Sequence, residues 1–149
     1  MAVKLLVDAD GCPVTDICIL KAKERGMEVL LVCDTAHILQ REGAQTLVVE
    51  KGADSADFAL VNRVNRGDIV VTQDYGLAAM CLSRGANVLR QDGLVYTADN
   101  IDALLLVRHE SRKHRASGGR FKGPKKRTHQ QDAAFENTLN HIIQTSVQG

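Results

Sequence analysis

Residues 3–14 of the chain read VKLLVDADGCPV, and this stretch indicates the class of fold. Residues 3–7 form a short apolar run rich in β-forming residues, and the DADG sequence that follows ends the run. Pro13 suits the first turn of a helix, and residues 14–25 have a helical pattern that Gly26 ends. The stretch therefore predicts a strand, a loop with two aspartates, and a helix.

The alternation of strand and helix patterns continues along the first two thirds of the chain. Further strands are predicted at residues 28–33, 45–49, 68–72 and 87–89, with a short extended piece at 94–96, and further helices at 54–66 and 75–84. Thr97 is a candidate cap for a helix that starts at about Ala98, and Thr128 for a last helix with an apolar side. Strands separated by helices are joined by right-handed crossovers, so we expect an α/β fold with a mostly parallel sheet.

The charge of the chain is divided unevenly along its length. Its 149 residues carry a net charge of +1, but residues 1–107 have a net charge of −5, residues 108–129 of +8 and residues 130–149 of −2. We expect one domain, made of an acidic α/β core (1–107), a basic loop (108–129) and a C-terminal helix (130–149). A basic segment of this density favours a polyanion such as nucleic acid as the partner.

Length and composition exclude several classes of protein. A chain with 44% hydrophobic and 25% charged residues fits an ordinary globular domain and not a disordered or collagen-like protein. No apolar run approaches the ~20 residues of a membrane-spanning helix, and no secretory pattern opens the chain, so no membrane partner is expected. The four cysteines lack CxxC or CxxH spacing, which argues against zinc and for reduced thiols in a cytoplasmic protein.

Acidic residues follow the predicted strands. They are Asp8 and Asp10 after the first strand, Asp34 after the second, Asp74 after the fourth and Asp92 after the fifth. Ligands of a parallel sheet bind beyond the carboxyl ends of its strands, so we expect these acids to gather at one edge. The pair Asp92-Gly93 also suits a simple turn.

The helix predicted at 54–66 adds two candidate acids. Asp57 lies on the apolar stripe of this helix, and Asp54 lies one turn earlier. Both also suit the positive end of a helix dipole, and whether they reach the strand ends depends on the topology.

Carboxylates gathered at one edge repel each other unless a cation or shared protons offset the charge. No His or Cys set with metal-ligand spacing accompanies them, so oxygen ligands dominate, and these suit Mg²⁺ or Mn²⁺. The chemistry expected of such a site is hydrolysis by a metal-activated water.

Three blocks of the sequence resemble the YaiI/YqxD family of bacterial proteins, which is grouped with PIN-like domains. The blocks are KLLVDADGCPV (4–14), GADSADFALVNRVNRGDIVVTQDYGLAAMCLSRGANV (52–88) and RASGGRFKGPKKRTHQQDAAFENTLNHII (115–143). The resemblance implies a three-layer α/β/α fold and a metal-dependent ribonuclease site.

The resemblance also implies roles for individual acids. PIN-like nucleases place an Asp after strand one, an acid on a helix, an Asp in a Thr-x-Asp motif after strand four, and an acid after strand five. The matching residues are Asp8, Asp57 or Asp54, Asp74 in the TQD sequence at 72–74, and Asp92, while Asp10 supplements or replaces one of these ligands. Of these, Asp8, Asp57 and Asp74 are the predicted catalytic residues.

Three further residues are candidates with competing interpretations. Cys12 precedes Pro13 at a helix start, which would lower its thiol pKa, but no base adjoins it in sequence and a packing role is favoured. His37 either orients water or phosphate or packs in its loop. Thr72 either positions Asp74 and phosphate or is an ordinary strand residue.

The basic segment is predicted to bind backbone phosphates without reading sequence. The residues concerned are Arg112, Lys113, Arg115, Arg120, Lys122, Lys125, Lys126 and Arg127. Phe121 is the one aromatic residue among them, so little base stacking is expected.

Three functions remain open at this point. The first is a Mg²⁺- or Mn²⁺-dependent nuclease, with RNA as the expected substrate, and the second is a non-catalytic RNA-binding protein with a structural cation. The third is a haloacid-dehalogenase-like phosphatase with Asp8 as nucleophile and Asp10 as acid/base, although this class needs a Lys and none occurs between Thr72 and Asp92. The choice between RNA and DNA, and the oligomeric state, stay open as well.

Overall fold

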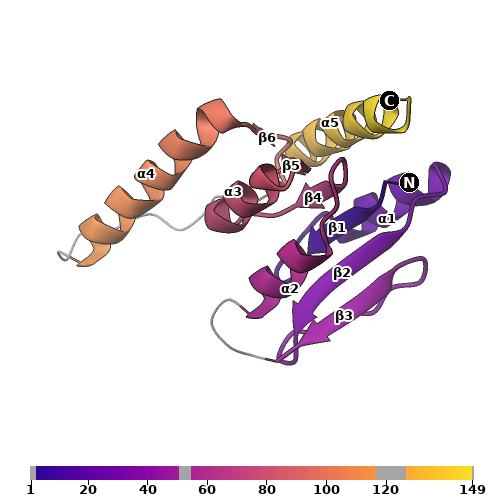
Figure 1. Cartoon of the computed structure of the whole chain (residues 1–149), viewed down its shortest axis with the longest axis horizontal. Coiled ribbons are helices and arrows are strands. Elements are labelled where there is room, and N and C mark those ends of the chain that lie inside the picture. Colours follow the sequence, from indigo (N-terminus) through magenta and orange to yellow (C-terminus); the bar gives the residue numbers. More distant parts are fainter. Residues whose placement is uncertain (1–2, 51–54, 117–126, 149) are drawn as a thin grey trace.

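The computed structural model describes residues 3–50, 55–116 and 127–148, and Figure 1 shows their arrangement. The strands are β1 (Leu5–Asp8), β2 (Val29–Asp34), β3 (Gln45–Val49), β4 (Ile69–Val71), β5 (Asn87–Leu89) and β6 (Val95–Tyr96). The helices are α1 (Thr15–Glu24), α2 (Ser55–Arg63), α3 (Tyr75–Ser83), α4 (Ala98–Ala116) and α5 (His129–Gln148). Strands and helices lie close to where the sequence predicts them, and a helix separates successive strands except between β2 and β3 and between β5 and β6.

The strands form one sheet in the order β3-β2-β1-β4-β5-β6. Neighbours from β3 to β5 pair in parallel, and β6 alone pairs antiparallel with β5. In the registers of β1, Val7 lies opposite Leu31 of β2 and Val71 of β4. The predicted mostly parallel α/β fold is therefore confirmed.

Helices cover both faces of the sheet because side chains of buried strands alternate between the faces. Leu5 and Val7 of β1 belong to a core formed with α1 and α5, whereas Leu6 belongs to a second core formed with α2, α3 and α4. α5 contributes Phe135 and Leu139, both fully buried, to the first core. This gives three layers, α/β/α, as the family resemblance implies.

Two helix starts confirm their predicted caps. Thr97 Oγ1 accepts the N–H of Asn100 at 3.1 Å, while the N–H of Thr97 donates to Asn100 Oδ1 at 2.9 Å. Thr128 and Gln131 form the same reciprocal pair of bonds at 3.2 and 3.0 Å. Each pair satisfies backbone groups that the first turn of a helix leaves without partners.

The helix that the sequence predicts from about Ala98 into the basic region is present as α4, and it shortens the predicted basic loop at its start. α4 continues to Ala116, so residues 108–116 are helical and not part of a loop. The sequence RHESRKHRA at these positions holds no Gly or Pro, and nothing in it ends a helix that is already formed. In Figure 1 this half of α4 runs away from the sheet. No helix within the described residues is long and apolar enough to cross a membrane.

A buried ion pair joins β1 to β4 at the amino ends of these strands. Asp68 is 1% exposed, and its carboxylate lies 2.6 Å from Lys4 Nζ. The carboxylate also accepts the backbone N–H groups of Lys4 at 3.1 Å and Asn65 at 2.8 Å. The bond from the N–H of Asn65 closes a turn that follows α2. The helix ends at Arg63, and not at residue 66 as the sequence pattern predicts.

We expect the Asp68→Ala substitution to lower the free energy of unfolding by about 3 kcal/mol, since it leaves a partly buried ammonium and buried N–H groups without their acceptor. Urea unfolding followed by circular dichroism measures this. The matched control is Asp16→Ala, because Asp16 is 83% exposed and meets Arg41 only at 3.4 Å. Asp16→Ala should lower the free energy of unfolding by less than about 1 kcal/mol. Equal effects for the two variants would contradict the stabilising role of the buried Asp68 ion pair.

Candidate metal centre

The candidate site lies where the connections of the sheet change direction. From β1 the chain passes to β2 on one side, and β4 pairs with β1 on the other side. Ligands of open parallel sheets bind beyond the carboxyl ends of the strands at such a switch point. Asp8 is the last residue of β1 and Asp74 is the N-cap of the helix that follows β4, so both acids stand at this edge.

The hydroxyl group of Thr72 links these two aspartates. It donates to Asp8 Oδ2 at 2.9 Å and accepts the backbone N–H of Asp74 at 3.0 Å. Asp74 Oδ1 accepts the N–H of Leu77 at 3.1 Å, which is the side-chain bond expected of an N-cap. The Tyr96 hydroxyl donates to the carbonyl of Thr72 at 3.1 Å. The TQD segment is therefore held by bonds to β1, α3 and β6.

Burial raises the pKa of the Asp8 carboxyl group above its ordinary value. The hydrogen bond from Thr72 opposes this shift, and the negative charges of Asp74 and Asp10 add to it. No positive charge of the described residues is among the causes that set the pKa of Asp8, and a bound cation would supply one.

Four more carboxylates join Asp8 around one open pocket of about 320 Å³. The acids that line it are Asp8, Asp10, Asp34, Asp57 and Asp74. Asp57 reaches the pocket because it lies in the first turn of α2, which packs on β1 and β2. The structure thus brings together four of the predicted metal ligands and adds Asp34. Asp34 follows the second predicted strand, and this position indicated that it could lie at the same edge of the sheet.

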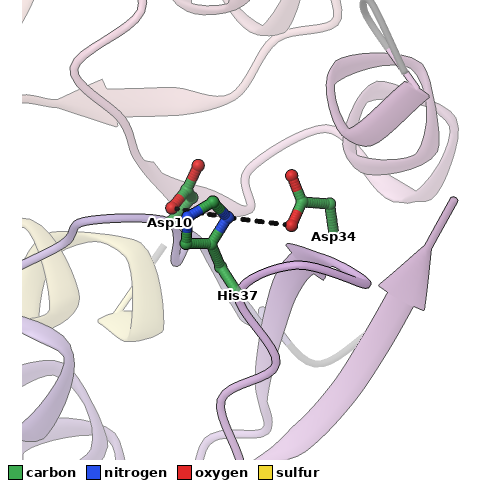
Figure 2. Close-up of side chains that lie close together, drawn as sticks. All are labelled: Asp10, Asp34 and His37. Atoms are coloured by element: carbon green, nitrogen blue, oxygen red, sulfur yellow. Dashed lines mark hydrogen bonds and ion pairs between the residues drawn. The ribbon is translucent and has the colours of Figure 1, made fainter. Parts of the chain in front are cut away.

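Asp10, Asp34 and His37 form a closer group at the rim of this pocket (Figure 2). His37 Nδ1 lies 3.0 Å from Asp34 Oδ1 and 3.5 Å from Asp10 Oδ1. One potential ligand atom from each residue lies within 4.8 Å of the others. The hydrogen bond from His37 lowers the pKa of Asp34. His37 therefore contacts the acids at the pocket, which the sequence interpretation left open.

The donor groups fit a hard divalent cation. Asp8, Asp10, Asp34, Asp57 and Asp74 offer carboxylate oxygens and line the same pocket, and His37 adds a ring nitrogen close to Asp10 and Asp34. Mg²⁺ and Mn²⁺ prefer oxygen ligands and bind through a few carboxylates together with water. The raised pKa of the Asp8 carboxyl group fits the same interpretation, because a nearby cation would favour its ionised form.

The structure does not bring Asp92 into this pocket. Arg90 donates to both carboxylate oxygens of Asp92, through Nε at 2.9 Å and Nη2 at 2.7 Å, and the N–H of Leu94 adds a third bond at 3.2 Å. The hydrogen bond from Arg90 lowers the pKa of Asp92. Asp92 therefore closes the turn after β5 and neutralises Arg90. A turn was the alternative to a metal ligand that the sequence analysis gave for this residue.

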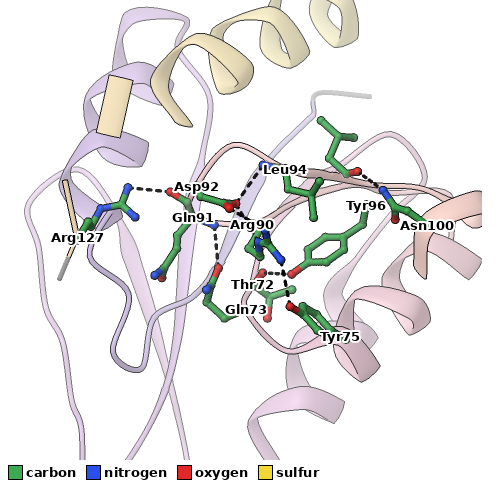
Figure 3. Close-up of polar contacts among 11 residues, drawn as sticks. Thr72, Gln73, Tyr75, Arg90, Gln91, Asp92, Leu94, Tyr96, Asn100 and Arg127 are labelled. Carbon is green, nitrogen blue, oxygen red and sulfur yellow. Dashed lines mark hydrogen bonds and ion pairs between the residues drawn. The ribbon is translucent and has the colours of Figure 1, made fainter. Parts of the chain in front are cut away.

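The turn after β5 supports the TQD segment from its other side (Figure 3). The N–H of Gln91 donates to Gln73 Oε1 at 2.8 Å, and Arg90 Nη1 donates to the hydroxyl of Tyr75 at 3.0 Å. Gly93 has φ +92°, and a Cβ atom there would lie 2.8 Å from the carbonyl oxygen of Ala134 in α5. Only glycine fits this close approach of the turn to α5.

Arg127 has a structural role that sequence reasoning missed. It was predicted to bind phosphate, but its guanidinium donates to the carbonyl of Gln91 at 2.7 Å and to Asp132 Oδ1 at 2.6 Å. Its side chain is 19% exposed. Arg127 therefore ties the start of α5 to the turn after β5.

Burial raises the pKa of the Cys12 thiol, which corrects the expectation that the helix start would lower it. This residue is therefore an unsuitable nucleophile and packs against the core. The remaining predicted residues lie outside the described part of the chain or have no described side chain: Asp54, Arg112, Lys113, Arg115, Arg120, Lys122, Lys125 and Lys126. Their roles stay predictions.

Fold and site together define an α/β/α protein with a carboxylate-lined pocket beyond the ends of its central strands. The chain belongs to the YaiI/YqxD family: the family described as "Uncharacterized BCR, YaiI/YqxD family" matches residues 6–145.

Curated relatives match along nearly the whole chain. A UPF0178 protein of Exiguobacterium sibiricum is 54% identical over 140 residues, which cover 94% of this chain and 96% of the relative. A UPF0178 protein of Ruminiclostridium cellulolyticum is 48% identical over 146 residues, which cover 98% and 95%. Among solved structures, a mutant of Rae1 (YacP) from Bacillus subtilis has 14% identity and a TM-score of 0.44, covering 98% of this chain and 99% of that one.

We expect Asp8→Asn to raise the free energy of unfolding at pH 7 in EDTA. A carboxyl group with a raised pKa in the folded state costs stability above that pKa, and the cost disappears as the pH falls through it. The neutral amide removes the cost at all pH values, so the two unfolding curves should converge in acid. Thermal unfolding as a function of pH measures the effect.

The matched control is Asp92→Asn, whose effect has the opposite sign. Arg90 lowers the pKa of Asp92, so this carboxylate contributes stability above its unfolded pKa and loses it as the pH falls through the folded value. Asp92→Asn should therefore destabilise the protein at pH 7. A destabilising effect of Asp8→Asn in EDTA would contradict the electrostatic description of the pocket.

Proposed function

We propose that this protein is a Mg²⁺- or Mn²⁺-dependent phosphodiesterase that cleaves nucleic acid, with RNA as its substrate. The observation that carries the proposal is the gathering of five carboxylates, among them the partly buried Asp8, around one pocket at the switch point of the sheet. Carboxylates gathered around one pocket repel each other, and a bound cation would offset this repulsion.

Asp8, Asp10, Asp57 and Asp74 are the residues that would hold the ion. A divalent ion in this pocket would supply an activated water and neutralise the charge that develops on the phosphoryl oxygens. The protein itself fixes the positions of the ligands. The Thr72 hydroxyl donates to the Asp8 carboxylate and accepts the backbone N–H of Asp74. Fixed ligands need no reorganisation during the reaction.

Two features favour nucleic acid as the substrate. The sequence blocks resemble the YaiI/YqxD family, which is grouped with PIN-like domains, and this grouping implies that Asp8, Asp57 and Asp74 match the metal ligands of those nucleases. The segment at 108–129 has a net charge of +8, which suits the backbone phosphates of a polynucleotide. RNA is preferred over DNA on the resemblance alone, so the assay below is repeated with a DNA strand of the same sequence.

We expect the wild-type protein to cleave end-labelled single-stranded RNA with Mn²⁺ and not with EDTA. Asp8→Asn and Asp74→Asn should each reduce the rate at least about 100-fold, because losing a metal ligand removes several kcal/mol of transition-state stabilisation. Asparagine is also a good N-cap, so Asp74→Asn should leave α3 intact. Gel analysis of the labelled fragments measures the rates.

The matched control is Asp102→Asn. Asp102 is an exposed residue of α4 and does not line the carboxylate pocket. This variant should cleave like the wild type. Absence of metal-dependent cleavage by the wild type, with RNA still bound in a salt-dependent manner, would replace the proposal by a non-catalytic RNA-binding protein.

A further inference from the structure

A phosphodiester approaching this pocket meets a concentration of negative charge. The carboxylate pocket has no Lys or Arg among its lining residues in the part of the chain that the structure describes, and the same holds for a small hollow beside it. Even with a cation bound, the phosphate oxygens that do not contact the ion need hydrogen-bond donors. A phosphate group at this pocket would therefore be held by uncharged hydrogen-bond donors.

A small hollow of about 20 Å³ adjoins the carboxylate pocket, and Asp8 and Asp10 line both. This volume accommodates one water molecule, and thus one oxygen atom of a ligand. The hollow is also lined by Thr72, Gln73 and Gln91. The Thr72 hydroxyl already donates to Asp8, so it is not available as a donor to a ligand.

The orientation of the Gln73 amide is fixed by its neighbour. A backbone N–H can only donate, so the bond of 2.8 Å from the N–H of Gln91 identifies the accepting atom of Gln73 as Oε1. The amide nitrogen is therefore the other end of the group. Within the described residues no hydrogen bond takes up this nitrogen, and the side chain is exposed to solvent.

Gln91, which holds Gln73, is itself held. Its carbonyl accepts a bond of 2.7 Å from Arg127, and Asp132 fixes the same guanidinium at 2.6 Å. The exposed Gln73 amide is thus anchored through the turn after β5 to the start of α5 (Figure 3). A donor held in this way loses little conformational freedom when a ligand binds.

We propose that Gln73 positions the substrate by donating an amide N–H to a non-bridging phosphate oxygen of the nucleic acid at the hollow. The inference rests on the proposed function, since it assigns a substrate contact to the same site. It makes Gln73 a determinant of substrate binding that carries no charge and therefore does not disturb the adjacent carboxylates.

The test compares Gln73→Glu with Gln73→Ala. A glutamate still accepts the N–H of Gln91 but cannot donate to phosphate at pH 7, whereas alanine loses both bonds. Binding is measured by the anisotropy of a fluorescein-labelled single-stranded RNA oligonucleotide with Mn²⁺, with gels to verify that the probe is intact. We expect both variants to weaken binding about tenfold or more, and Gln73→Glu at least as much as Gln73→Ala.

The matched control is Gln144→Glu, an exposed position in α5 that makes the same change of charge far along the helix from Asp132. It should bind RNA like the wild type. A Gln73→Ala variant that binds RNA like the wild type would overturn the inference, because alanine has no donor, as would a wild-type protein that does not bind RNA. A wild type that binds RNA through Gln73 but does not cleave it would contradict the proposed function alone.

Discussion

The hydroxyl group of Thr72 is the interaction on which the geometry of the candidate centre depends. It is buried at the end of β4, and it donates to the carboxylate of Asp8 while accepting the backbone N–H of Asp74. One side chain thereby fixes Asp8, the last residue of β1, relative to Asp74, the third residue after β4. Because these strands are neighbours in the middle of the sheet, the spacing of the carboxylates follows from the strand pairing and not from the loops.

The two ends of the β1–β4 strand pair differ in whether a buried or partly buried carboxylate has a positively charged partner among the described residues. At the amino end, Asp68 is buried and has an ammonium group and two N–H groups as partners. At the carboxyl end, burial and neighbouring acids raise the pKa of Asp8. The first arrangement stabilises the fold, and the second costs stability that a bound cation would return. Functional sites commonly concentrate such unfavourable interactions, because the surrounding structure holds them in place.

The parts of the structure that depend on local sequence were predictable, and those that depend on competing partners were not. Strand alternation and the caps at Thr97 and Thr128 involve residues only a few positions apart. Asp92 follows its strand as expected, but Arg90 two residues earlier takes up its carboxylate. The Arg127 bond to Gln91 spans 36 residues, and no pattern in the sequence indicates it.

The packing of α5 has a consequence for the synthesis of the protein. α5 supplies Phe135 and Leu139 to the core that Leu5 and Val7 enter from β1, so residues near opposite ends of the chain must meet before this face of the sheet is covered. A ribosome delivers β1 first and α5 more than a hundred residues later. During that interval α1 covers only part of this face, and the apolar surface that α5 later buries stays exposed, which favours aggregation of the nascent chain.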